Sequence, residues 1–229
     1  MLIFAHRGVS GHFPENTLSA FQAALDANCA AIELDVFAVA GELVVIHDRQ
    51  LERTTNGRGY LEDHSIAQLQ QLDAGQGQKI PTLWQVLQLV ANRVILNIEL
   101  KGADTAMLLV AMLQKAQAEL QLDLENIIVS SFNHLVLQQL QQELPQLKLG
   151  VLIAHRPLEG AAIAEQFKAY SLNCDRGFID QELVADAHRR QIKVFVYTVN
   201  QQREALELKQ MGVDGIFCNY PEEAQHWFK

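Results

Sequence analysis

The order of secondary structure implied by the hydrophobic pattern constrains this chain more than any other feature. Short apolar runs rich in Val, Ile and Phe alternate with longer segments in which apolar residues recur at helical spacing. Such runs are typical of buried parallel strands, so their alternation with helices predicts an α/β fold. The eight runs span residues 2–5, 31–36, 94–100, 127–131, 149–153, 170–174, 193–199 and 215–218.

The spacing of these runs favours a closed barrel over an open sheet. Eight units in 229 residues give about 29 residues per strand and helix, which is typical of a (β/α)8 TIM barrel. The alternative is an open doubly wound sheet, which usually binds a nucleotide through a glycine-rich first turn. Neither GxGxxG nor GxxxxGK occurs in the chain, so the barrel is the preferred fold.

Polar and glycine residues at the ends of helical segments predict where two helices begin or end. Apolar residues recur at helical spacing after Asn16, which we expect to cap that helix. We expect Asn200 to cap a later helix that ends at Gly212, because glycine readily adopts the left-handed conformation that follows a helix.

One segment interrupts the regular alternation after the second strand. Residues 37–47 predict a β-hairpin with its turn at Gly41–Glu42, and residues 49–80 follow as an irregular insertion. A long excursion from a compact domain is often functional, although an inert surface loop is equally compatible with this composition. We therefore expect a single domain over residues 1–229 with an insertion at about 49–80.

Composition and charge exclude several classes of protein. Hydrophobic residues make up 49% of the chain and the formal net charge is −9, so the chain can bury a core but argues against a nucleic-acid partner or a polybasic membrane anchor. The three cysteines are far apart and lack CxxC spacing, which disfavours a disulfide framework or a zinc ribbon. No apolar run approaches the ~18 residues of a membrane span, and the N-terminus lacks the basic segment of a signal peptide. These features predict a soluble cytoplasmic protein.

Acidic side chains occupy inward-facing positions on two strands. Residues i and i+2 share one face of a strand, so Glu33 and Asp35 point into the barrel while the apolar residues between them point outward. The same alternation places Asn97, Glu99 and Lys101 on one inward face of the next parallel strand. Both sets lie near the C-terminal ends of their strands, where barrel enzymes have their active sites.

Three carboxylates at one end of a barrel require compensation. Two like charges ~4 Å apart repel by about 4 kcal/mol at an effective dielectric constant of ~20. Glu33, Asp35 and Glu99 therefore need protons or a cation, and an all-oxygen ligand set suits Mg²⁺ or Ca²⁺. The alternative is a polar plug in which Arg7 and Lys101 neutralise the acids.

Two histidines are predicted at the same end of the barrel. His6 ends the first strand, and His47 ends the hairpin beside Asp48. Either one alone is more often structural, but together they could supply an acid and a base near neutral pH. A carboxylate pair could also serve a glycosidase, yet Arg7 and Lys101 beside the proposed site favour an anionic substrate.

Several short motifs follow one another in a fixed order across nearly the whole chain. They are HRG at 6–8, PENT at 14–17, IELDV at 32–36, VIHD at 45–48, RTTNGRG at 53–59, IPTL at 80–83, IELK at 98–101, SF at 131–132 and TVN at 198–200. Each motif is weak alone, but the ordered set is highly specific. On this set the chain closely resembles the glycerophosphodiester phosphodiesterase family.

The resemblance implies a (β/α)8 barrel with a small inserted subdomain. It places the family's metal ligands on Glu33, Asp35 and Glu99 and its catalytic histidines on His6 and His47. It also implies that the PENT stretch orders the first loop.

The resemblance further implies residues that contact the substrate. Arg7 and Lys101 match the basic residues that contact phosphate in the family, and the SF and TVN stretches place Phe132 and Tyr197 on the substrate side. Tyr197 stands where the family pattern often has Trp.

The implied reaction is the hydrolysis of glycerophosphodiesters to sn-glycerol 3-phosphate and an alcohol, with one divalent cation, Mg²⁺ or Ca²⁺. One histidine acts as base and the other as acid, and His47 as the base is the preferred order. The nucleophile is either the substrate's glycerol 2-hydroxyl or water. Alternatives are a phospholipase acting on lysophospholipids at the same site, and a non-catalytic barrel that binds a phosphorylated metabolite. The alcohol group and the oligomeric state stay open.

Overall fold

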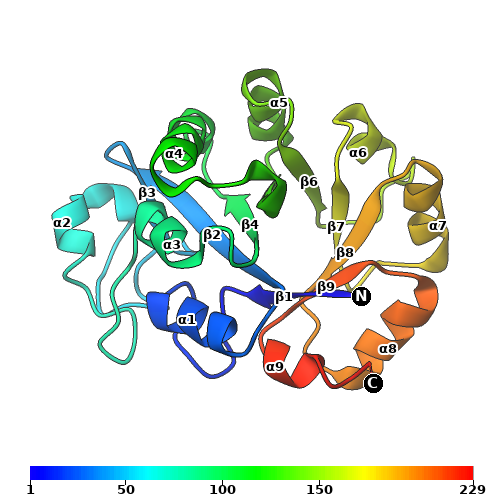
Figure 1. Ribbon diagram of the computed structural model, residues 1–229, viewed down its shortest axis with the longest axis horizontal. Coiled ribbons are helices and arrows are strands. Elements are labelled where there is room, and N and C mark those ends of the chain that lie inside the picture. The colour runs from blue at the N-terminus through cyan, green and yellow to red at the C-terminus, as the bar shows by residue number, and fades with distance from the viewer. Residues whose placement is uncertain (229) are drawn as a thin grey trace.

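The computed structural model describes residues 1–228, which form a closed parallel barrel surrounded by helices (Figure 1). Eight of the nine described strands are parallel neighbours, and β1 pairs with both β2 and β9 to close the barrel, while β3 pairs antiparallel with β2. The predicted (β/α)8 TIM barrel is therefore confirmed. The strands are β1 Leu2–His6, β2 Ala31–Val39, β3 Glu42–Val45, β4 Ile95–Leu100, β5 Ile127–Ser131, β6 Lys148–Ile153, β7 Ser171–Asp175, β8 Lys193–Tyr197 and β9 Gly215–Cys218.

Helices follow most of the strands and cover the outside of the barrel. No helix within residues 1–228 combines the length and the apolarity that crossing a membrane requires. The helices are α1 Leu18–Asp26, η1 Leu61–Asp63, α2 Ile66–Leu69, α3 Leu83–Val90, α4 Thr105–Leu120, η2 Leu124–Asn126, α5 His134–Glu143, α6 Ala162–Gln166, α7 Gln181–Arg189, α8 Gln202–Met211 and α9 Pro221–Ala224.

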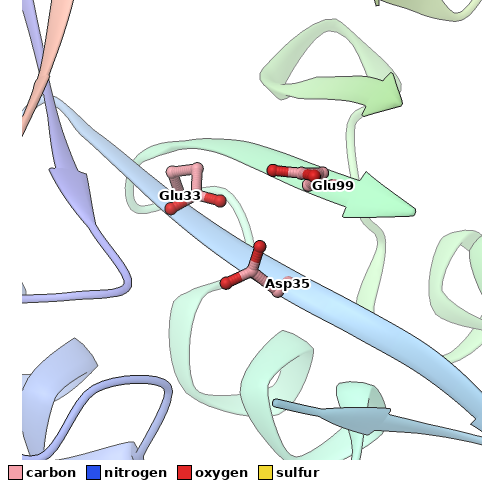
Figure 2. A group of neighbouring side chains, drawn as sticks. All are labelled: Glu33, Asp35 and Glu99. Carbon is pink, nitrogen blue, oxygen red and sulfur yellow. The ribbon is translucent and has the colours of Figure 1, made fainter. Parts of the chain in front are cut away.

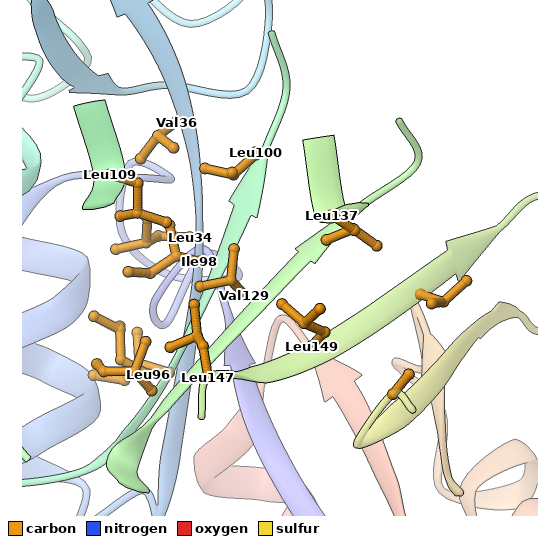
Figure 3. Close-up of a cluster of buried hydrophobic side chains, with 14 of the residues drawn as sticks. Leu34, Val36, Leu96, Ile98, Leu100, Leu109, Val129, Leu137, Leu147 and Leu149 are labelled. Atoms are coloured by element: carbon orange, nitrogen blue, oxygen red, sulfur yellow. The ribbon is translucent and has the colours of Figure 1, made fainter. Parts of the chain in front are cut away.

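The main hydrophobic core lies between the barrel and its helices. Alternate residues of β2, such as Leu34 and Val36, point outward with Ile98 of β4 and pack with Leu109 of α4 (Figure 3). The opposite set of residues on these strands therefore faces the barrel interior, as the period of two in the sequence predicts.

Aromatic rings fill the interior of the barrel below its C-terminal end. Phe4 stacks on Phe217 with ring centroids 4.7 Å apart and meets Phe195 edge-on at 5.0 Å. His6 lies two residues further along β1 than Phe4 and is paired in register with Glu33. The aromatic layer thus lies below the level of His6 and Glu33.

The predicted hairpin is present, with its turn one residue earlier than expected. Val39 pairs with Glu42, so the turn residues are Ala40 and Gly41, which have φ of 48° and 84°. Gly41 tolerates a positive φ because it has no Cβ atom.

The predicted helix boundaries are partly wrong. Thr17, not Asn16, caps α1 by accepting a hydrogen bond from the Ala20 amide, because the Asn16 side chain binds Asp35 instead. Gly212 does end α8 with φ of 89°, but Asn200 does not cap that helix. Its Oδ1 accepts a hydrogen bond from the Asn219 amide across the barrel end.

The insertion at 49–80 packs around a hydrophobic cluster of its own. Leu51, Leu61, Leu69 and Ile80 are buried in it together with residues of the β2–β3 hairpin. The segment lies beside β3, at the left of the molecule in Figure 1. This separate cluster supports the proposal that 49–80 is an inserted subdomain of a single domain.

Candidate active site

The strand register brings three carboxyl groups together at the C-terminal end of the barrel. Glu33 and Asp35 project from β2, and Glu99 projects from β4 at the position paired with Asp35 (Figure 2). One oxygen from each group lies within 4.8 Å of the others. The three residues are only 3%, 1% and 8% exposed, so these charges are held almost out of water.

Two basic side chains partly neutralise this cluster. Lys101 Nζ lies 3.1 Å from Asp35 Oδ1 and 2.5 Å from Glu99 Oε1. Arg7 Nε lies 3.2 Å from Asp35 Oδ2, and the Arg7 backbone amide donates a hydrogen bond of 3.0 Å to Glu33 Oε2. The cluster therefore contains three carboxyl groups and two cationic side chains, so its net charge is negative by one unit when every carboxyl is ionised.

The pKa values of the acids diverge for this reason. Burial, followed by repulsion from Asp35 and Glu99, raises the pKa of Glu33 well above its usual value. Burial and repulsion from Asp35 also raise the pKa of Glu99, to about 7. Burial alone would raise the pKa of Asp35, but Lys101 and Arg7 outweigh it and lower that pKa to about 2.

The donor set fits a hard divalent cation. Asp35 Oδ1 and Glu99 Oε1 are buried and accept no hydrogen bond within the described chain, although both lie close to the Lys101 ammonium. Carboxylate oxygens are the ligands that Mg²⁺ and Ca²⁺ prefer, and a divalent cation would remove the excess negative charge. Glu33, Asp35 and Glu99 can therefore hold one such ion.

A tight turn after β1 places Arg7 against the acids. Arg7 and Gly8 have φ of 57° and 80°, and a Cβ atom on Gly8 would lie 2.6 Å from the Ala20 backbone carbon. Glycine is required there because both the conformation and the close approach exclude a side chain. The turn directs the Arg7 amide to Glu33, while Arg7 Nη1 donates to Glu15 Oε1 at 2.8 Å.

The two histidines have different partners. His6 Nδ1 lies 2.7 Å from Asn219 Oδ1, whereas His47 Nδ1 lies 2.5 Å from Asp48 Oδ1. Burial, and then the charge of Arg7, lower the pKa of His6 to about 4. Burial also lowers the pKa of His47, although the nearby carboxylates oppose this shift.

Arg53 of the insertion joins the second histidine to the first loop. Its Nε donates to Asp48 Oδ2, and its two terminal nitrogens donate to the Glu15 carboxylate at 2.9 and 2.8 Å. Glu15 also accepts the hydrogen bond from Arg7, so its carboxylate bridges the two arginines. The RTTNGRG stretch thereby reaches the C-terminal end of the barrel through Arg53.

A cavity of about 200 Å³ opens among these residues and collects eight of the nine residues singled out in the sequence. The ninth, Asp35, lies beside it and contacts both Arg7 and Lys101. Phe132 and Tyr197 form an apolar part of the wall, with ring centroids 5.9 Å apart and edge-to-face. The lining residues are His6, Arg7, Glu33, His47, Asn97, Glu99, Lys101, Ser130, Phe132, Leu152, Tyr197, Thr198 and Phe217.

Some of the supporting residues were not predicted from the sequence. Asp48 and Arg53 lie in motifs that the sequence did show, so proximity to His47 and the motif RTTNGRG were available signals. Asn219 gave no such signal, because it lies 213 residues from His6 along the chain.

Comparison with known proteins connects this geometry to a family. The model of the glycerophosphoryl diester phosphodiesterase family matches residues 6–223. A glycerophosphodiester phosphodiesterase of Caldanaerobacter subterraneus is 37% identical over 231 residues, covering 96% of this chain and 95% of that protein. One from Bacillus altitudinis is 35% identical over 236 residues, covering 97% and 96%.

A solved structure shows the same similarity to a phosphodiesterase. A phosphodiesterase of Oleispira antarctica, solved in complex with the product sn-glycerol-3-phosphate, superposes with a TM-score of 0.91 at 29% identity. The alignment covers 100% of this chain and 96% of that one.

Proposed function

Since the chain belongs to the glycerophosphoryl diester phosphodiesterase family and is a phosphodiesterase, we propose that it hydrolyses glycerophosphodiesters to sn-glycerol 3-phosphate and an alcohol. The observation that carries the proposal is the convergence of three buried carboxyls, two basic side chains and two histidines around one cavity. The product bound to the Oleispira antarctica relative supports the choice of glycerol phosphate.

Glu33, Asp35 and Glu99 would hold one Mg²⁺ or Ca²⁺ ion in this proposal. Such an ion, when bound, withdraws electron density from phosphoryl oxygens and stabilises the negative charge that grows on them. Arg7 and Lys101 line the same cavity and add two further positive charges. They would bind the phosphoryl oxygens and offset the charge of the transition state.

His6 and His47 would transfer the protons. One accepts the proton of the attacking hydroxyl, and the other protonates the alkoxide that leaves phosphorus. The attacking hydroxyl is either the glycerol 2-hydroxyl, which gives a cyclic phosphate that water then opens, or water itself. Phe132 and Tyr197 would contact the carbon skeleton of the substrate, because they form the apolar wall of the cavity.

The alternative of a phospholipase requires an apolar surface around the site. Leu61 and Leu69 of the insertion do not supply it, since they are 1% and 0% exposed inside the insertion's own cluster. Phe132 of the cavity wall and Tyr60 of the insertion are 44% and 43% exposed, so an assay with both kinds of substrate has to decide between the two functions.

Phosphorus NMR of a reaction with glycerophosphocholine tests the proposal. We expect release of glycerol phosphate that stops after exhaustive treatment with EDTA and returns when Mg²⁺ or Ca²⁺ is added. Vesicles of lysophosphatidylcholine should be hydrolysed much more slowly. Full activity after chelation would exclude the metal, and faster hydrolysis of the vesicles would favour the phospholipase. A transient cyclic phosphate signal would identify the glycerol 2-hydroxyl as nucleophile.

A further inference from the structure

A second open space, the insertion hollow, lies beside the cavity. Its volume is about 690 Å³, and His47 lines both the insertion hollow and the cavity, so the two spaces adjoin at this side chain. The proposed hydrolysis gives this space no role. The residues that line the insertion hollow are His47, Asp48, Arg49, Gln50, Glu52, Arg53 and Tyr60.

Two extended segments of the insertion form a wall of the insertion hollow. Gln50 and Tyr60 pair in an antiparallel bridge, and the Leu51 amide donates a hydrogen bond of 3.0 Å to the Gly59 carbonyl. Because side chains alternate along extended backbone, Leu51 and Leu61 point into the insertion's own hydrophobic cluster. Their neighbours Gln50 and Tyr60 line the insertion hollow instead. The cluster that folds the insertion therefore also directs the Tyr60 ring to this space.

The cavity by itself is small for a whole diester. It holds about 200 Å³, whereas pockets that enclose drug-sized ligands hold about 300–1,000 Å³. A glycerophosphodiester joins two alcohols through one phosphate, so it extends to both sides of phosphorus. When the phosphate lies at Arg7 and Lys101, one alcohol occupies the cavity and the adjoining insertion hollow is open to the other.

Both arginines of the insertion hollow are already paired with acids. Arg49 forms an ion pair with Glu62, and Arg53 forms ion pairs with Asp48 and Glu15. The positive charges of these arginines are therefore neutralised by neighbouring side chains of the protein.

Glu52 has no such partner in the insertion hollow. Its Oε1 accepts a hydrogen bond of 2.8 Å from the Gly59 amide. Within residues 1–228, no basic side chain lies within ion-pair distance of the Glu52 carboxylate, and Arg58 acts on it from farther away. The insertion hollow therefore contains one carboxylate whose charge is not neutralised by a contact.

Tyr60 adds an aromatic surface to this carboxylate. It is 43% exposed, and the guanidinium carbon of Arg49 lies 5.3 Å from the centroid of its ring. The ring thus already binds one cation, and its exposed part is open to another. An aromatic ring together with a carboxylate attracts an organic ammonium group.

We propose that the insertion hollow is the subsite for the alcohol half of the substrate, and that Glu52 and Tyr60 favour alcohols that carry a positively charged nitrogen. This inference rests on the proposed function and names the substrate class as glycerophosphodiesters of amino alcohols. Arg7 and Lys101 of the cavity bind the anionic phosphate, while the insertion hollow binds the ammonium group. The two spaces thereby match the two charges of such a zwitterion.

The first test compares two diesters of equal shape in the wild-type enzyme. One is glycerophosphocholine, and the other is its uncharged analogue, in which a carbon atom replaces the choline nitrogen. The rate of glycerol phosphate release at saturating Mg²⁺ gives kcat/KM for each. We expect kcat/KM to be at least ~5-fold higher for glycerophosphocholine, because a cation–π contact and a carboxylate both stabilise its bound form.

The possible outcomes separate this inference from the proposed function. Equal kcat/KM values for the two diesters overturn the inference, although the enzyme is then still a glycerophosphodiester phosphodiesterase. Hydrolysis of neither diester contradicts the proposed function, and the inference fails with it.

The second test changes the two residues that the inference names. Glu52→Gln and Tyr60→Leu should each lower the ratio of the two kcat/KM values at least ~2-fold, because each removes one attraction for the ammonium group. The difference in intrinsic reactivity between the two alcohols cancels when this ratio is compared between enzymes. The value of kcat/KM for the uncharged analogue should stay within about twofold of wild type, since neither variant alters the phosphate contacts.

Glu42→Gln is the matched control for this series. Glu42 is an exposed acid of β3 that does not line the insertion hollow, so its replacement removes the same charge from another part of the surface. We expect the wild-type ratio in this variant. A wild-type ratio in both Glu52→Gln and Tyr60→Leu, or an equal decrease in Glu42→Gln and Glu52→Gln, overturns the inference.

Discussion

Single side chains set the charge balance at the mouth of the barrel. Asp35 contacts both Arg7 and Lys101, so the protein itself neutralises this acid. Glu33 and Glu99 are left with raised pKa values, because burial and mutual repulsion disfavour their charged forms. The missing positive charge is the physical reason to expect a divalent cation beside them.

The inward direction of these acids could be predicted because side chains alternate strictly along a strand. The contacts that give these acids different pKa values could not be predicted from the sequence. Asp35 and Glu99 meet only because β2 and β4 pair in one particular register. Likewise, Asn16 was expected to cap a helix, but its amide binds Asp35, a choice that depends on where β2 lies.

Replacing either histidine by alanine should lower kcat at least ~10²-fold, because proton transfer by a positioned side chain contributes about that much. The measurement is the rate of glycerol phosphate release from glycerophosphocholine at saturating Mg²⁺. His64→Ala is the control, since His64 lies in the insertion and hydrogen-bonds the Tyr60 carbonyl away from the cavity residues. A wild-type rate for His6→Ala or His47→Ala would remove that residue from the mechanism.

The insertion at 49–80 is a folded element that contacts the candidate site. Its hydrophobic cluster holds the segment against the hairpin, and Arg53 extends from it to Asp48 and Glu15. The composition of this segment is compatible with either a functional or an inert role. The contact of Arg53 with the partner of His47 favours a functional role.

Arg53→Leu should lower kcat by ~10-fold or more, because Asp48 loses the group that holds it against His47. Thermal unfolding should change little, since Arg53 is exposed and exposed ion pairs contribute little to stability. Arg58→Leu is the matched control, because Arg58 is an exposed arginine of the same segment. Equal kcat values for the two variants would contradict a positioning role for Arg53.

The whole barrel separates apolar and charged layers along its interior. Phe4, Phe195 and Phe217 fill the lower layer, and the acidic cluster occupies the upper one. Closure of the barrel keeps water away from the carboxyls, which raises the free energy of their charged forms. Without a bound cation, the buried carboxyls should therefore lower the free energy of unfolding.

Mg²⁺ should raise the unfolding temperature, because an ion that binds only the folded state at 100 times its Kd adds about 2.7 kcal/mol of stability. Glu99→Gln should lose most of this increase, and Glu125→Gln, which alters an exposed acid before β5, should keep it. Differential scanning calorimetry with and without EDTA measures the effect. An equal increase in Glu99→Gln and wild type would contradict the metal site.

The same variants give a pH dependence with a defined sign. Folding raises the pKa of Glu99 to about 7, so the folded state binds more protons than the unfolded state between the two pKa values. Without metal, this residue's contribution to stability therefore falls as pH rises from 5 toward 8. The wild type should lose stability relative to Glu99→Gln over that range. A constant difference between the two proteins would contradict the raised pKa.

The sequence by itself determined the barrel, the inward acids and the two histidines, since periodicity and ordered motifs are local properties that survive in a single chain. Tertiary structure alone decided which groups complete them. His6 meets Asn219 because β1 pairs with β9, and Glu15 joins Arg7 to Arg53 because the insertion folds back over the first loop. Hydrogen bonds act over about 3 Å, so residues far apart along the chain become partners only once closure of the barrel fixes their positions.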